Sequence, residues 1–249
     1  MTQLFKKAFM AIAPSSVLLT STVDEVKIQG YNKSGFGGRG VFLKGIDYEP
    51  ELKYLKYLIN EGSVLFDIGA NSGVYSMMAA KLVGKKGTVV AVEPFPAMSA
   101  MLVKNSELNK FSNVRVRTFG ASHKTEVRTF WLNDDKPNSF SFSIQHQDAK
   151  ELSFLTVSLD DLFEWEKLDR LDYIKIDAEG EEDNILKGAE KVIAKYKPVI
   201  QVEITQRQPQ SIPSDYRIFH IPGSDNHYYI PGSSDKIQIA IDQGWEIIK

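Results

Sequence analysis

Short apolar runs alternate with amphipathic segments along most of this chain. Uniformly apolar runs are typical of parallel strands buried on both faces, whereas apolar residues three or four positions apart are typical of helices. The pattern predicts strands at 64–66, 88–93, 114–118, 172–177 and 198–204, and helices at 51–60, 74–82, 96–109 and 181–194. Strands and helices in alternation indicate an α/β fold, in which helices cover both faces of a mostly parallel sheet.

The segments that flank this alternation have weaker patterns. The N-terminal residues around 6–13 predict a short amphipathic helix; a signal peptide is the alternative, disfavoured by Pro14 and by the lack of a clear cleavage site. Residues 24–48 predict a β-hairpin or meander, in which 26–28 and 41–43 flank a glycine-rich turn. We therefore divide the chain into an N-terminal extension, 1–45, and a main domain, 46–249. Further strands are predicted at 127–132, 155–158, 216–221 and 228–231, a closing helix at 235–244, and a candidate lid or specificity loop at 133–150.

Composition limits the function classes. The chain has 249 residues, of which 43% are hydrophobic, enough for one α/β domain with a small appendage. The formal net charge of −2 gives no global attraction to nucleic acid. Because cysteine is absent, disulfides, thiolate metal sites and cysteine nucleophiles are excluded, and a cytoplasmic location is expected. No segment approaches the roughly 20 apolar residues of a membrane span, so none is expected.

The turn that follows the first predicted strand indicates a nucleoside-cofactor site. Asp67 ends the strand, and Gly69 and Gly73 allow a tight turn into the next helix, which Asn71 or Ser72 is expected to cap. About twenty residues later, Glu93 ends the second strand, where an acid holds the ribose hydroxyls of a bound nucleoside. A glycine turn without any ligand is the alternative interpretation.

The spacing of the glycines favours one cofactor over another. Dinucleotide sites use G-x-G-x-x-G, with the pyrophosphate on the helix N-terminus, but here Asn71 replaces the middle glycine. Asp67 adds negative charge beside the turn. That charge would disfavour binding of an anionic pyrophosphate but would be compatible with a cationic sulfonium. The pattern therefore favours S-adenosylmethionine over NAD.

Acidic residues stand at or near four predicted strand ends, at Asp67, Glu93, Asp177 and Glu203. Ligands of open α/β sheets bind at the carboxyl ends of the strands. Each acid alone could cap the following helix. Four together indicate a bound group that is cationic or rich in hydroxyls.

Several segments together resemble the FkbM-type methyltransferases. The signature of that family is Lys-x-Asp-x-Glu-Gly, matched by Lys175, Asp177, Glu179 and Gly180. Other matching segments are Leu-Asp-Asp-Leu at 159–162, Leu-x-Gly-Ala at 186–189, the cofactor loop at 66–76, Val-Glu-Pro at 92–94 and Tyr-Glu-Pro at 48–50. The resemblance covers about 46–204, and residues 1–40 and 205–249 match nothing diagnostic.

The resemblance implies a class I, Rossmann-like fold with a seven-stranded sheet, and makes 46–249 a methyltransferase domain. It implies S-adenosylmethionine as cofactor and O-methylation of a hydroxyl on a sugar, glycan or natural product. A small-molecule or glycan acceptor is thus the expected partner, without nucleic acid, and no motif fixes the oligomeric state. An NAD-dependent oxidoreductase and a non-catalytic nucleoside-binding module are the alternatives.

The residues expected to bind the cofactor gather at three places. They are Asp67, Gly69, Ala70, Asn71, Gly73 and Tyr75 at the turn, Glu93, Pro94 and Phe95 after the second strand, and Gly120, Ala121 and Ser122 after the third. The turn is assigned to the methionine end and the adjacent ribose, and Glu93 to the ribose diol. Phe95 either flanks the adenine or belongs to the core, and Ser122 is a candidate hydrogen-bond partner for the adenine edge.

The expected catalytic residues are Asp177, Lys175, Glu179 and Glu203. Lys175 and Asp177 should project to the same side of a strand, where they can orient the acceptor hydroxyl, and Asp177 or Glu179 can take its proton. In the alternative interpretation, Lys175 and Glu179 form a supporting ion pair, and Glu179 and Gly180 cap the next helix.

A metal-dependent variant of this site is less favoured. Some related O-methyltransferases bind Mg²⁺ through carboxylates at two strand ends, here Asp177 and Glu203, but no third ligand is evident. The four histidines, at 123, 146, 220 and 227, show no metal-binding spacing. His146 is a candidate base, and a solvated loop histidine is the alternative.

Overall fold

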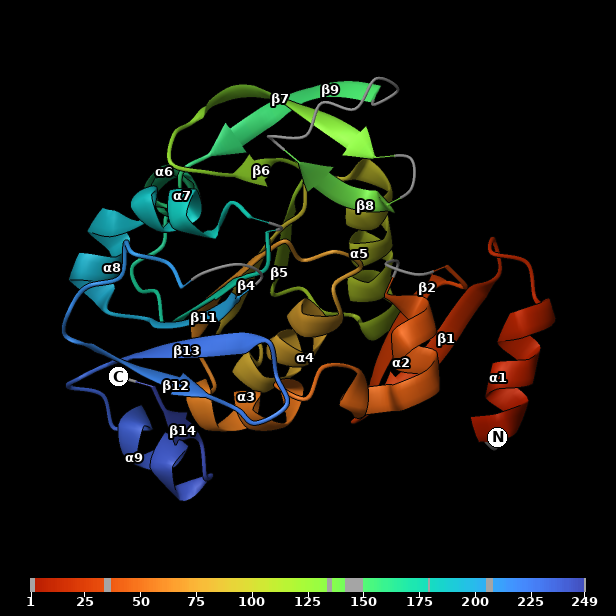
Figure 1. The fold of residues 1–249 in the computed structure, drawn as a ribbon, viewed down its shortest axis with the longest axis horizontal. Coiled ribbons are helices and arrows are strands. Elements are labelled where there is room, and N and C mark those ends of the chain that lie inside the picture. Colours follow the sequence, from red (N-terminus) through yellow and green to blue (C-terminus); the bar gives the residue numbers. More distant parts are fainter. Residues whose placement is uncertain are drawn as a thin grey trace.

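The computed structural model describes residues 3–33, 37–133, 136–141, 150–178, 180–204 and 208–248. Within these ranges, the largest sheet has eight strands in the order β14-β12-β13-β11-β10-β3-β4-β5 (Figure 1). Their bounds, in that order, are Glu246–Ile247, Tyr216–His220, Asn226–Pro231, Val199–Glu203, Tyr173–Ile176, Val64–Ile68, Thr88–Val92 and Val114–Arg117.

The pairing of these strands confirms the expected Rossmann-like α/β sheet. The strands β11, β10, β3, β4 and β5 pair in parallel, and β13 pairs antiparallel with both β11 and β12. The sheet was expected to have seven strands, and within the described residues it has eight. The additional strand is the two-residue β14, which lies at the edge beside β12. Parallel pairing brings the carboxyl ends of β3, β4, β10 and β11 to one edge of the sheet.

Helices cover both faces of the large sheet, as expected. The helices α3 (Leu52–Leu58), α4 (Val74–Val83), α5 (Pro96–Asn109) and α9 (Lys236–Asp242) contribute to the core on one face. The helices α6 (Leu159–Trp165), α7 (Glu182–Lys187) and α8 (Glu190–Tyr196) contribute to the core on the other. Neighbouring residues of one strand enter different cores, such as Leu65 and Phe66 of β3. This alternation explains why the strand is apolar at nearly every position.

The single helix predicted at 181–194 is wrong, because α7 and α8 are separate helices. Gly188 lies at the break. A Cβ at this position would lie 2.3 Å from the carbonyl oxygen of Ser122, and the carbonyl of Gly188 accepts a hydrogen bond from the Asp160 backbone at 2.8 Å. The contacts of Gly188 with Ser122 and Asp160, both distant in sequence, therefore accompany the end of α7, although the amphipathic pattern of 181–194 continues past this point.

A smaller, four-stranded sheet has the order β6-β9-β7-β8. Its strands are Gly120–Ala121, Lys150–Val157, Glu126–Asn133 and Lys136–Ser141, in that order. It lies at the top of Figure 1, beyond the large sheet. The strands expected at 127–132 and 155–158 belong to it. The candidate lid at 133–150 is partly strand β8, and 142–149, with His146, lie outside the described residues.

The N-terminal segment forms α1 (Gln3–Ile12), β1 (Leu18–Val23), β2 (Val26–Tyr31), α2 (Gly38–Lys44) and the 3₁₀ turn η1 (Gly45–Tyr48). The short N-terminal helix is confirmed. The expected hairpin was placed wrongly: β1 pairs with β2, and residues 41–43 lie in α2. A Cβ at Gly38 would lie 2.3 Å from the Gly30 carbonyl, so α2 begins directly against β2. The glycines thus permit close packing.

This segment folds onto the main sheet's core. Val26, Ile28 and Val41 join the same hydrophobic cluster as α3 and α4. Asn105 of α5 accepts a hydrogen bond from the Gln29 backbone at 2.7 Å and donates one to the Gln29 carbonyl at 2.9 Å. Within the described ranges, no helix has both the length and the apolar character needed to cross a membrane.

Candidate active site

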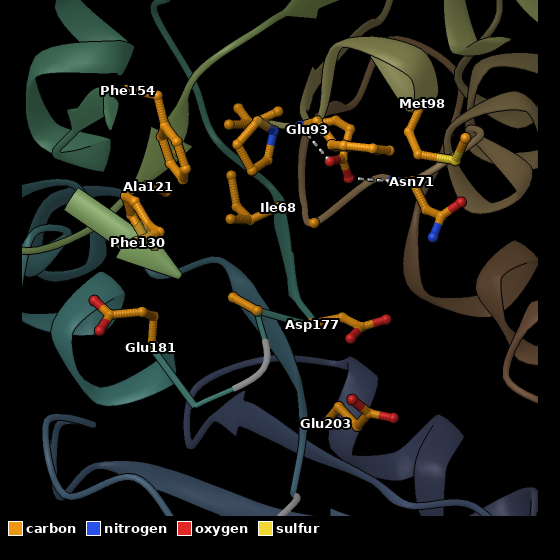
Figure 2. A pocket seen from close by; sticks show the side chains of 16 residues that line it. Ile68, Asn71, Glu93, Met98, Ala121, Phe130, Phe154, Asp177, Glu181 and Glu203 are labelled. Carbon is orange, nitrogen blue, oxygen red and sulfur yellow. Dashed lines mark hydrogen bonds between the residues drawn. The ribbon is translucent and has the colours of Figure 1, made fainter. Parts of the chain in front are cut away.

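A cavity of about 270 Å³ opens at the carboxyl ends of the central strands (Figure 2). Nine of the expected site residues line it: Gly69, Asn71, Glu93, Pro94, Phe95, Gly120, Ala121, Asp177 and Glu203. Figure 2 shows Glu93 and Asn71 on one side of the cavity, and Asp177 and Glu203 on another. The structure therefore brings together residues that are separated by more than a hundred positions in the chain.

The turn between β3 and α4 is held by backbone contacts. The N–H groups of Gly69 and Ala70 both donate to the Val92 carbonyl, at 3.0 Å each. Gly69 has φ +77°, and a Cβ there would lie 1.8 Å from the Asp177 carbonyl oxygen. Glycine at this position therefore allows the ends of β3 and β10 to approach, in addition to leaving the cavity open.

The helix cap predicted at Asn71 or Ser72 is wrong. The N-cap of α4 is Gly73, with φ 86°, and no side chain caps the helix. Asn71 has φ +51°, and its Oδ1 accepts from the Ser72 N–H at 2.7 Å. Because the left-handed Gly73 carries the chain into the helix, the polar side chains before it are displaced from the capping position.

Glu93 follows β4 and is held by the cofactor turn. Its Oε2 accepts from the Asn71 N–H and its Oε1 from the Phe95 N–H, each at 2.8 Å. Burial raises the pKa of Glu93 to about 7, against the lowering effect of these two bonds. A carboxylate has about four lone-pair sites, so each oxygen can accept another hydrogen bond from a ligand in the cavity.

Lys175 stands between two carboxylates. Its Nζ lies 3.1 Å from Asp177 Oδ2 and 3.7 Å from Asp67 Oδ1. Burial would lower the pKa of Lys175, but the charges of Asp177, Asp67 and Glu49 outweigh it and raise that pKa. The expectation that Lys175 and Asp177 project to the same side is confirmed.

The environment of Asp177 holds its pKa below the ordinary value. Burial would raise its pKa, but the charge of Lys175 and hydrogen bonds with Glu203 and Lys175 hold it below the ordinary value. Asp177 and Glu203 are thus in contact, as a two-carboxylate metal site would require. No group of three or more His, Cys, Asp or Glu side chains suited to a metal ion occurs within the described ranges. Glu179 lies outside them.

Other expected cofactor residues, Asp67, Ala70 and Tyr75, do not line the main cavity. Asp67 is fully buried, and its Oδ2 accepts from Ser76 Oγ at 2.5 Å. Tyr75 bonds to Tyr173 and Gln201 at 3.0 and 2.6 Å. Ala70 and Tyr75 instead line a neighbouring pocket.

Gly73 and Ser122 are engaged by other side chains. A Cβ on Gly73 would lie 2.7 Å from Leu102 Cγ. Ser122 is fully buried, and its Oγ donates to Glu181 Oε2 at 3.0 Å and accepts from Arg128 at 2.7 Å. The hydroxyl expected to reach an adenine is therefore part of a buried ionic network.

The sequence did not predict two parts of the cavity lining: the aromatic rings from β7 and β9, and the acidic Glu181, which precedes α7. The Phe130 and Phe154 rings stack with centroids 3.7 Å apart, and both line the cavity near Ala121 (Figure 2). Glu181 lines it too and pairs with Arg128 at 3.0 Å. Alternation along 126–133 indicates a strand, but nothing local shows that β7 and β9 pair and face the cofactor turn.

The strand order and the cavity at the carboxyl ends of β3, β4 and β10 define a class I methyltransferase-type protein. The family model of the methyltransferase FkbM domain matches residues 67–220. The chain belongs to this family, which confirms the resemblance seen in its motifs.

A curated relative and solved structures are similar to this chain. The hexuronic acid methyltransferase AglP of Haloferax volcanii is 27% identical over 163 residues, 64% of each chain, so this chain spans less than two thirds of that relative. Methyltransferase FkbM from Methylobacillus flagellatus is 19% identical with TM-score 0.47, covering 77% of this chain and 53% of its own. A SAM-dependent methyltransferase from Agrobacterium tumefaciens is 12% identical with TM-score 0.46, covering 79% of this chain and 56% of its own.

Proposed function

We propose that this chain is an S-adenosylmethionine-dependent methyltransferase that methylates a hydroxyl on a sugar, glycan or natural product. The observation that carries the proposal is the geometry of Glu93. Two backbone N–H groups, one from the cofactor turn and one from Phe95, fix this carboxylate at the cavity wall. A fixed pair of acceptor oxygens matches the two adjacent hydroxyls of a ribose.

The charge of the cavity favours a sulfonium over a dinucleotide. Four acidic side chains line it, those of Glu93, Asp177, Glu181 and Glu203, and its described lining includes no Lys or Arg, although Arg128 pairs with Glu181. These acids would repel a pyrophosphate and attract a cation. Phe95, Met98 and Ala121 offer apolar surface for the adenine. When bound, S-adenosylmethionine would supply the activated methyl group.

Proton transfer is assigned to Asp177. Because its pKa is held below the ordinary value, Asp177 is ionised near neutral pH and can accept the proton of an acceptor hydroxyl. Lys175 fixes the orientation of Asp177 through the 3.1 Å contact. Glu203, in contact with Asp177, can accept a hydrogen bond from the same acceptor. Glu179, which follows Asp177 by two residues, is the alternative base.

The acceptor would lie between the aromatic pair Phe130–Phe154 and the acids Glu181 and Glu203. Aromatic faces pack against the C–H groups of a sugar ring, and carboxylates accept hydrogen bonds from its hydroxyls. The name of the Haloferax relative, a hexuronic acid methyltransferase, supports a sugar acceptor. Because the lining here is acidic, we place hydroxyls, rather than any anionic group of the acceptor, against Glu181 and Glu203.

Calorimetry with S-adenosylmethionine, S-adenosylhomocysteine and NAD⁺ tests the cofactor. We expect both adenosyl ligands to bind and NAD⁺ not to bind; the reverse would favour an oxidoreductase. Transfer of labelled methyl groups to a panel of hydroxyl-bearing glycans and natural products tests the reaction. Binding of the cofactor without transfer to any acceptor would instead favour a non-catalytic nucleoside-binding module.

A further inference from the structure

The N-terminal helix α1 is attached to the rest of the molecule along one side. Its Met10 side chain is buried, and the Phe9 ring lies against the Phe42 ring of α2, with centroids 6.3 Å apart. Lys6 Nζ donates to the Phe42 carbonyl at 2.7 Å. At the other end of the helix, Asn32 Nδ2 donates to the Met10 carbonyl at 3.0 Å. Figure 1 shows α1 at the outer edge of the molecule, away from the large sheet, so these contacts fix the helix with its opposite side outward.

The outward side of α1 is apolar. Its residues recur three or four positions apart and are all exposed, so they share one face of the helix: Leu4, Phe5, Ala8, Ala11 and Ile12. We call these five residues the α1 outer face. Leu4 is 80% exposed and Ile12 84%. Single exposed hydrophobic residues are ordinary, but apolar residues gathered on one exposed face mark a site that contacts a protein or a membrane.

The charge beside this face is positive. The helices α1 and α2 contain no Asp or Glu, and their cations are Lys6, Lys7, Arg39 and Lys44. Lys7 is exposed and borders the outer face, because it lies three residues after Leu4 and four before Ala11. Lys44 is exposed too. It lies near the start of α1, because Gln3 Nε2 donates at 3.0 Å to the carbonyl of the residue before Lys44.

This charge contrasts with that of the rest of the chain. Residues 1–46 contain six Lys or Arg and two Asp or Glu, whereas the whole chain has a net charge of −2. The two acids, Asp24 and Glu25, lie in the turn between β1 and β2, and Glu25 pairs with Lys81 of α4 at 3.0 Å. Positive charge is therefore concentrated at α1 and α2 of an otherwise acidic chain. Such an asymmetry favours a partner with an anionic surface.

We propose that the α1 outer face binds an anionic lipid surface, with α1 lying in the plane of the membrane interface. A helix with an apolar side and flanking cations places its apolar residues at the boundary of headgroups and acyl chains, and its cations among the headgroups. Each Lys or Arg near an anionic membrane strengthens binding about fivefold. The inference goes beyond the proposed function, because this binding needs neither the cofactor nor the acceptor.

A second copy of this chain fits the face less well. In a twofold-symmetric contact the same surface of both copies meets, so Lys7 and Lys44 would approach the same cations of the other copy. Like charges brought together oppose association. An anionic lipid surface attracts these cations instead. Its apolar phase also requires no hydrogen bonds, and the side chains of the α1 outer face are hydrocarbon only.

Sedimentation of the full chain with lipid vesicles tests the proposal. One set of vesicles contains equal parts of phosphatidylglycerol and phosphatidylcholine, and the other contains phosphatidylcholine alone. Wild-type protein should bind the anionic vesicles at least about tenfold more tightly than the neutral ones, since two exposed cations border the face. Raising the salt concentration should weaken this binding, because salt screens exposed charges.

Three variants identify the surface that binds. The double variant Leu4→Gln with Ile12→Gln should bind anionic vesicles at least about tenfold more weakly, because two apolar side chains no longer enter the lipid. Both residues are mostly exposed, so its melting temperature without vesicles should match that of wild type. Lys7→Gln should weaken binding about fivefold. Ile241→Gln is the matched control, because Ile241 is an exposed apolar residue of another helix, α9; it should bind vesicles as wild type does.

The outcomes are distinguishable. If wild-type protein does not sediment with anionic vesicles, or binds neutral vesicles equally well, the proposal is wrong. If the folded double variant binds as wild type does, the assignment of the α1 outer face is wrong. If wild type ignores vesicles and forms a concentration-dependent dimer that the double variant abolishes, the face is a contact between copies of this chain, and the lipid proposal fails. The proposed function is tested separately, by the calorimetry and methyl-transfer assays.

Discussion

Replacing Glu93 tests the proposed cofactor site most directly. In the wild-type protein, the N–H groups of Asn71 and Phe95 each donate to Glu93 at 2.8 Å. In Glu93→Ala, these two N–H groups lose that acceptor, and the ribose loses a charged one. A hydrogen bond to a charged group contributes about 1.5–3 kcal/mol. Two such bonds to a ribose diol would contribute about 3–6 kcal/mol to the binding free energy. The cost of desolvating the carboxylate on binding reduces this contribution. We therefore expect S-adenosylhomocysteine affinity to fall by at least about a hundredfold, since 1.4 kcal/mol is a factor of ten.

The measurement is calorimetric titration at pH 8, where Glu93, with a pKa of about 7, is mostly ionised. Glu107→Gln on the exposed face of α5 is the matched control and should bind as wild type does. Thermal unfolding separates binding from stability, because the freed N–H groups should also lower the melting temperature. A folded Glu93→Ala variant with wild-type affinity would refute both the ribose assignment and the reasoning from the two held oxygens.

Three other predictions follow from the site. Asp177→Asn should bind S-adenosylhomocysteine nearly as wild type does but slow methyl transfer about 10²- to 10⁴-fold; an unchanged rate would remove Asp177 as the base. Gly69→Ala should lower the free energy of unfolding in denaturant titrations, because its Cβ would lie 1.8 Å from the Asp177 carbonyl; wild-type stability would contradict this. The raised pKa values of Glu93 and Glu49, both about 7, make folding favour their protonated forms. Stability from these groups is present below pH 4.5 and is lost as the pH rises through 7. The melting-temperature increase caused by S-adenosylhomocysteine should instead grow over pH 6–8, as Glu93 ionises; a pH-independent increase would contradict the ribose assignment of Glu93.

The sequence was sufficient where local pattern and site coincide. The strands β3 and β4 are apolar at nearly every position, and the glycine turn after β3 leads directly into α4, most of whose residues are buried. The parallel pairing of β3 with β4 then places the turn after β3 beside Glu93, and this placement depends on these two strands alone. The family motifs around Lys175 and Asp177 similarly lie on a strand whose side-chain alternation fixes which side they face.

The sequence was insufficient where distant backbone segments touch. Residues 41–43 are an apolar run that fits a strand equally well, and they become helical because Gly38 packs α2 against Gly30. The break at Gly188 depends on the backbone of Ser122, which is separated from it by more than sixty residues. The pairing of Phe130 with Phe154 requires β7 and β9 to meet. None of these contacts leaves a periodic signal in its own segment.

The role of Lys175 shows how structure changes the meaning of a motif. From the sequence, Lys175 and Asp177 form a pair at the site, and Asp67 is a separate acid at another strand end. In the structure, Asp67 lies inside β3, directly paired in register with Lys175, and is fully buried. Without the lysine, the fully buried carboxylate of Asp67 would lose the nearby cation, and breaking a buried ion pair by removing one partner costs roughly 3–5 kcal/mol. Lys175 is therefore a positioning residue that allows Asp67 to anchor α4 through Ser76 while Asp177 stays ionised at the cavity.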